Sequence, residues 1–112
     1  NYLDFEKEKE IMLAKVPSFN TKEKEEIIEL MIKVADLTRK GMANGDISTV
    51  MSPRTVLTWA QNAEIFDHNY ALSFNLTFLN KCDESEKQII SEYYQRCFGD
   101  ELSSSTNDFT LV

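Results

Sequence analysis

The tripeptide Ser52-Pro53-Arg54 fixes the start of a helix near the middle of the chain. Ser52 is a good N-cap, because its hydroxyl can accept a hydrogen bond from the free N–H groups of the first turn. Pro53 then takes the first helical position, where its missing N–H costs nothing. Arg54 follows beside the positive end of the helix dipole, an unfavourable place for a cation unless it meets an anion. Spacing alone favours the plainer interpretation, a solvated arginine or one paired with a carboxylate.

A first helix is expected near the N-terminus. Asp4 can cap it, and it should run to about Val16, since the residue before Pro17 avoids the helical region. The chain begins with Asn rather than Met, which suggests a fragment of a longer protein.

A second helix is expected between Asn20 and about Ala43. Asn20 followed by Glu23 resembles a capping box. Gly41 weakens a helix by about 1 kcal/mol, so we expect fraying there. The apolar positions repeat every three to four residues and form one stripe; they are Ile27, Ile28, Met31, Val34, Ala35 and Thr38.

The helix begun at Pro53 should end near Phe66, before a polar break at 67–69 in which His68 is expected to be exposed. Residues 70–81 then fit two patterns. Their apolar side chains alternate with other residues, as in a β-strand, and they also form a helical stripe. No second strand candidate lies nearby to pair with them, so we predict a helix that is apolar nearly all round and central.

The last predicted helix begins after Asp83, which forms another capping-box pattern with Glu86. It should end at Gly99, the usual residue type at a helix C-terminus. Residues 100–112 are rich in Ser, Thr and Asn and have little to bury, so we predict a disordered tail. The whole chain is therefore expected to be all-α, a compact bundle of about five helices in one domain.

Composition excludes several functions. The net charge of −7 argues against binding to nucleic acid or to an anionic membrane surface. No apolar run reaches the roughly 20 residues of a membrane span, and no signal peptide is visible. Cys82 and Cys97 are interpreted as reduced thiols of a cytoplasmic protein, and with a single histidine an intrinsic metal site is not expected.

No catalytic motif is visible in these residues. The phosphate-binding sequence GxxxxGK[ST] is missing, and one histidine cannot support a nucleophilic triad. From the residues alone, the chain is a helical domain whose chemistry stays open.

Several blocks together resemble the C-terminal part of the ATPase subunits of aerobic cobaltochelatases, which are AAA+ ATPases of the magnesium-chelatase and MoxR type. The blocks are VADLTR at 34–39, NGDISTVMSPRTV at 44–56, WAQNAEIF at 59–66, LTFLNKCDE at 76–84 and YQRCFG at 94–99. The resemblance spans roughly residues 1–99 and leaves out the tail at 100–112.

The resemblance implies that residues 1–99 are the helical lid of such an ATPase and that 1–3 leave the last strand of an upstream core. It makes Arg54 the sensor-2 arginine, which would contact the γ-phosphate of the nucleotide, with Ser52 and Pro53 positioning it. ATP and Mg²⁺ would be bound mainly by that core, so this fragment alone should be inactive.

The resemblance also implies partners and a reaction. Neighbouring copies in a ring and the other cobaltochelatase subunits would surround the lid, and ATP hydrolysis would drive cobalt insertion into hydrogenobyrinic acid a,c-diamide. Two alternatives stay open: a free-standing helical protein-interaction module, and the lid of a MoxR-type relative acting on other metalloproteins. A phosphate-binding loop upstream would exclude the first, and the blocks at 44–51 and 76–84 favour the cobalt enzyme over the second.

Overall fold

The computed structural model describes residues 4–99, which form helices and connections with no strand among them. The α-helices are α1 (Phe5–Lys15), α2 (Lys22–Ala43), α3 (Pro53–Ile65), α4 (Tyr70–Thr77) and α5 (Glu84–Phe98), and the 3-10 turns are η1 (Pro17–Phe19) and η2 (Leu79–Lys81). The predicted all-α bundle of about five helices is confirmed. The expectations for 1–3 and 100–112 lie outside the described residues.

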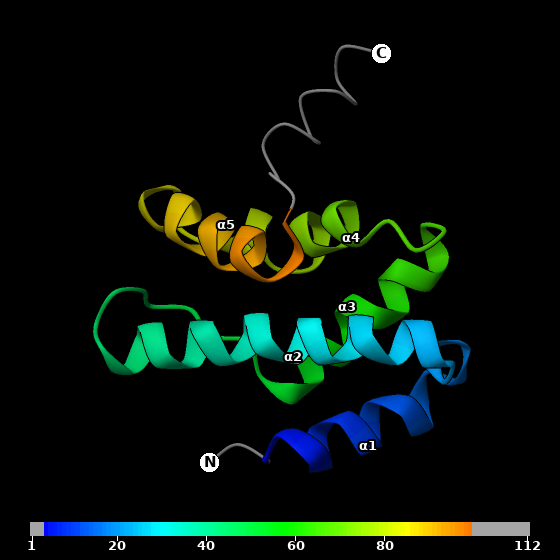
Figure 1. The fold of residues 1–112 in the computed structure, drawn as a ribbon. Helices are drawn as coiled ribbons and strands as arrows, with labels where there is room; N and C mark the ends of the chain where they lie inside the picture. Colours follow the sequence, from blue (N-terminus) through cyan, green and yellow to red (C-terminus); the bar gives the residue numbers. More distant parts are fainter. Residues whose placement is uncertain (1–3, 100–112) are drawn as a thin grey trace, which may run out of the picture.

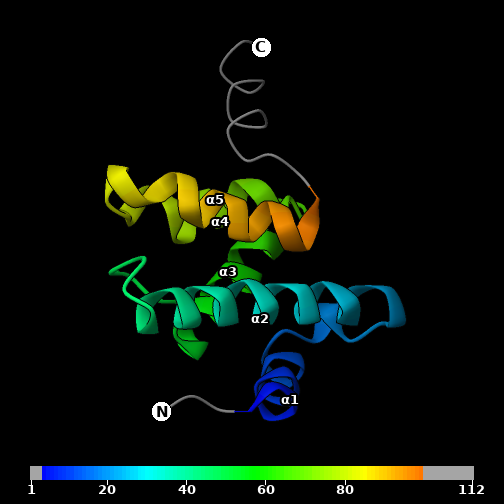
Figure 2. The same ribbon diagram turned by 60° about the vertical axis from the view of Figure 1, so that its left-hand side comes forward.

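The helices are arranged in three levels around the long helix α2 (Figures 1 and 2). In both views α1 lies on one side of α2, and α4 and α5 lie on the other. Helix α3 packs against α1, α2 and α4 and so links the levels. The start of α3 is therefore close to both α1 and α2.

The predicted N-caps Asp4 and Ser52 are confirmed, and the predicted N-cap Asn20 is wrong. The Asp4 carboxylate accepts from the Lys7 N–H at 2.9 Å, and the Ser52 hydroxyl accepts from the Thr55 N–H at 3.2 Å. Thr21, not Asn20, caps α2. Asn20 is instead the C-cap of the turn η1, where its N–H bonds to the carbonyl of residue 17, and α2 starts one residue later than predicted.

The capping box expected at the start of α5 does not form. Asp83 is the N-cap residue, but its side chain makes no capping hydrogen bond. The Glu86 carboxylate instead accepts from the Ser48 N–H at 3.0 and 3.1 Å and from the Ser48 hydroxyl at 3.1 Å. Glu86 thus bonds to the connection between α2 and α3 instead of capping the start of its own helix. At the other end, α5 stops at Gly99 as predicted, and this glycine adopts a left-handed conformation with φ of 80°.

Residues 70–81 were predicted to form one helix, and the structure has a shorter helix α4 that ends at Thr77, followed by the 3-10 turn η2. The burial of α4 also differs from the prediction. Leu76 is 42 % exposed, whereas Ser73, Asn75 and Thr77 are buried. The Ser73 hydroxyl bonds to backbone carbonyls in the first turn, and Thr77 accepts from the Asn62 amide at 2.8 Å. Because the Ser73 and Thr77 hydroxyls are bonded internally, α4 can turn them inward, and the expectation of a helix apolar all round and central is wrong.

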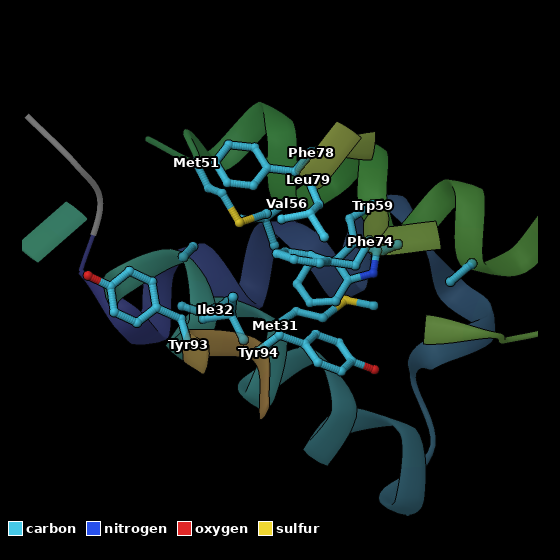
Figure 3. Packing of buried hydrophobic residues seen from close by; sticks show 14 of the residues in the cluster. Met31, Ile32, Met51, Val56, Trp59, Phe74, Phe78, Leu79, Tyr93 and Tyr94 are labelled. Carbon is cyan, nitrogen blue, oxygen red and sulfur yellow. The ribbon is translucent and has the colours of Figure 1, made fainter. Parts of the chain in front are cut away.

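The core centres on Trp59, which is fully buried between α3, α4 and α5. Its ring lies 4.7 Å from that of Phe74 and 6.2 Å from that of Tyr94, and Figure 3 shows Trp59 beside Phe74 with Tyr94 and Met31 nearby. The indole N–H donates to the carbonyl of Tyr70 at 3.1 Å. Trp59 therefore joins three helices and leaves no polar atom unsatisfied.

The break at 67–69 is confirmed, but His68 is not exposed as predicted. Asp67 and His68 both have positive φ, 57° and 60°. The His68 ring lies 5.3 Å from that of Phe19 and is half-buried rather than exposed. Packing against η1 explains why this turn does not leave the imidazole in solvent.

Gly41 does not fray the end of α2, which continues to Ala43. The glycine is buried because Tyr93 of α5 packs across it. A β-carbon at this position would run into the Tyr93 hydroxyl and would lie 3.3 Å from the Ile47 side chain. The residue is thus needed for the close approach of α5 to α2.

Gly41→Ala should therefore destabilise the protein, although alanine is the better helix former. We expect a loss of about 1–3 kcal/mol in the free energy of unfolding, the usual cost of overpacking, measured by urea denaturation. Adding Tyr93→Phe should recover part of the loss, because it removes the clashing hydroxyl. A Gly41→Ala variant as stable as the parent would show that α5 can shift without cost.

Candidate functional site

The structure places the three predicted site residues as the sequence indicated, at the first turn of α3. Ser52 is the N-cap, Pro53 is the first helical residue, and Arg54 follows with its side chain exposed. The Ser52 hydroxyl also lies 3.1 Å from that of Thr55, which further fixes this turn. Arg54 is thus held by a well-capped backbone while its guanidinium reaches outward.

Arg54 lies at a groove between α1 and α3 with a volume of about 470 Å³. Helix α1 contributes Glu8, Ile11, Met12 and Lys15 to the lining, and α3 contributes Pro53, Arg54, Leu57, Thr58 and Gln61. Lys15 and Arg54 are its exposed cations. The groove therefore combines an apolar lining with positive charge beside a helix N-terminus, a combination suited to an anion.

The one carboxylate of the groove is already paired. Glu8 is buried, and both of its oxygens accept from Arg39 of α2, at 2.9 and 2.8 Å. Arg39 also bonds to Asp36 at 2.9 Å. Burial by itself lowers the pKa of the Arg39 guanidinium, but the bonds and charges of Glu8 and Asp36 outweigh it and raise that pKa above its usual value.

The ion pairs of residues 4–99 do not include Arg54. The structure therefore does not pair Arg54 with a carboxylate of this part of the chain. Arg39 neutralises Glu8, so the Arg54 charge is not compensated locally and can be offered to a ligand.

The Glu8–Arg39 pair was not predicted from the sequence. A signal was present: Glu8 precedes the buried Met12 by four residues, and Arg39 follows the buried Ala35 by four. Residues four apart share a helix face. Two opposite charges on buried faces of neighbouring helices are therefore candidates for a buried pair.

Other chemistry finds no support in the described chain. No group of three or more His, Cys, Asp or Glu side chains between residues 4 and 99 could hold a metal ion. Within the same range, no helix combines the length and the apolar character that crossing a bilayer requires. Cys82 and Cys97 are both free thiols, and burial raises the pKa of Cys82 to about 11, which makes it a poor nucleophile.

Fold and site together define a class: a small helical domain that presents one arginine at a proline-started helix beside a groove. Over 111 residues the chain is 51 % identical to the aerobic cobaltochelatase subunit CobS of Sinorhizobium sp, which confirms the resemblance to these subunits. The matched region is 99 % of this chain and 33 % of that protein, so the chain spans about a third of its relative's length. No family model matches the chain, and no solved structure matches it significantly.

Proposed function

We propose that this chain is the helical lid of an AAA+ ATPase subunit of an aerobic cobaltochelatase and that Arg54 is its sensor-2 arginine. The observation that carries the proposal is the exposed Arg54, without an ion pair in residues 4–99, on a chain that is 51 % identical to a CobS subunit. Residues 1–99 would form the lid, and an upstream core would bind most of the ATP and Mg²⁺.

The role of Arg54 would be electrostatic. A guanidinium is permanently charged and can donate two parallel hydrogen bonds to phosphate oxygens. The N-terminus of α3 adds positive potential, which favours binding of a nucleotide that carries a γ-phosphate over one that lacks it. Arg54 would thus report whether the γ-phosphate is present, and the lid would rotate on the core when this contact is lost.

In the whole enzyme this cycle would drive cobalt insertion into hydrogenobyrinic acid a,c-diamide. The corrin and the cobalt would be held by other cobaltochelatase subunits, and neighbouring copies of the ATPase would form a ring.

The test is Arg54→Ala in the full-length subunit. We expect the affinity for ATP relative to ADP to fall by about 10- to 100-fold, the value of one or two charge-assisted hydrogen bonds, and ATP-dependent cobalt insertion to fall strongly. Titration with each nucleotide and a chelation assay measure these effects. The exposed Lys81→Ala serves as a control, because it removes a cation that belongs to the turn η2 and does not line the groove beside Arg54.

Unchanged nucleotide discrimination and chelation in the Arg54 variant would exclude the sensor role. A full-length sequence without a GxxxxGK[ST] loop ahead of this chain would instead support the alternative, a free-standing interaction module. The two results are independent, since the first concerns one side chain and the second concerns the domain to which it is attached.

A further inference from the structure

The residue immediately before the Ser52 cap has both of its backbone polar groups bonded to α2. The Met51 N–H donates to the Thr38 hydroxyl at 3.0 Å, and the Met51 carbonyl accepts from Arg39 Nε at 2.9 Å. Two consecutive side chains of α2 therefore bond the N–H and the carbonyl of one residue in the connection between α2 and α3.

These bonds are sheltered from water. Thr38 and Met51 are fully buried, and Arg39 is 9 % exposed. In such surroundings a hydrogen bond is strong, and a lost partner cannot be replaced by solvent. The position of Met51 is thus tightly determined.

The groups that hold Met51 are themselves fixed. The Thr38 hydroxyl donates to the Ala35 carbonyl at 2.7 Å, which leaves its oxygen aimed at the Met51 N–H. Arg39 is fastened by Glu8 and Asp36 on its other nitrogens. The restraint on Met51 is therefore part of a network that includes α1 and α2.

We propose that Thr38 and Arg39 are positioning residues for Arg54: by fixing Met51, they set the direction in which the first turn of α3 presents the guanidinium. Met51 is followed directly by the cap Ser52 and by Pro53, whose ring fixes its own φ, so little freedom separates Met51 from Arg54. This inference rests on the proposed function of Arg54 and extends it to two residues that do not contact the nucleotide.

The test compares Thr38→Val with Thr38→Ser in the full-length subunit. Valine keeps the shape of threonine but cannot accept from the Met51 N–H, whereas serine keeps the hydroxyl. Because misplaced contacts weaken steeply with small displacements, we expect Thr38→Val to lower the ATP-to-ADP affinity ratio by roughly 3- to 10-fold, and Thr38→Ser to restore it. Hydrogen exchange in residues 48–58 should become faster in the valine variant only.

Ile90→Val, a core change in α5, controls for lost stability, because it should reduce stability without changing the affinity ratio. Arg39→Lys provides a second variant in case Thr38→Val does not fold. Lysine keeps the positive charge beside Glu8 but lacks the Nε donor to the Met51 carbonyl. It should also lower the ATP-to-ADP affinity ratio. If Arg54→Ala lowers the ratio but neither Thr38→Val nor Arg39→Lys does, the positioning role is wrong and the proposed function stands. If Arg54→Ala itself has no effect, the proposed function fails, and this inference fails with it.

Discussion

Replacing Arg39 by alanine should lower the free energy of unfolding by about 3–5 kcal/mol. The reason is that the Glu8 carboxyl group, only 1 % exposed, would be left in the interior without the two hydrogen bonds that now compensate it. The carbonyl of Met51 would lose its donor as well. Urea denaturation followed by circular dichroism at 222 nm measures the change.

A double variant separates the charge from the packing. Glu8→Leu combined with Arg39→Met removes both charges and fills similar volumes, and such replacements of a buried pair are often neutral. It should therefore be more stable than Arg39→Ala alone. A loss below about 1 kcal/mol for Arg39→Ala, typical of an exposed pair, would mean that water reaches Glu8 in solution.

Trp59→Ala should cost a similar amount, about 3–5 kcal/mol, the usual range for removing a buried aromatic side chain. Trp59 is fully buried and lies against rings from both α4 and α5, so its loss opens a cavity where three helices meet. The same denaturation experiment measures the loss, since it follows helix content and does not depend on tryptophan fluorescence.

Trp59→Phe is the matched control. It keeps an aromatic ring in the core but loses the N–H that donates to the Tyr70 carbonyl. Because a single hydrogen bond contributes about 0.5–1.5 kcal/mol and the smaller ring adds a limited cavity, the phenylalanine variant should fall between the parent and Trp59→Ala. Equal losses for both variants would show that the indole N–H, and not the packing, dominates at this position.

The fold class could be predicted because its signals are local. Asp4, Ser52 and Gly99 act through groups within four residues of themselves, and the structure has each of them in the predicted role. The choice of helix over strand for 70–81 rests on elimination and is also confirmed, although α4 ends at Thr77. The first turn of α3, with Arg54 exposed, follows from the same kind of short-range rule.

The rest depends on segments far apart in the chain. Glu86 was expected to cap its own helix, but a serine 38 residues away offers it three hydrogen-bond contacts and takes its carboxylate. Glu8 and Arg39, 31 residues apart, meet only because α1 packs on α2. Gly41 was interpreted as a weak point of a helix, although it makes room for Tyr93. Local patterns cannot distinguish such uses, because the competing partner is defined only after the helices have packed.

The three-level arrangement has a practical consequence for experiments on this domain. Helix α1, which opens the described chain, forms one wall of the groove beside Arg54, whereas α5, which closes it, lies on the far side of α2 (Figure 2). A fluorescent dye or a surface tether attached just after Gly99 would therefore leave the arginine accessible. The same attachment ahead of Asp4 would place the probe next to α1, the helix that forms one wall of the groove beside Arg54.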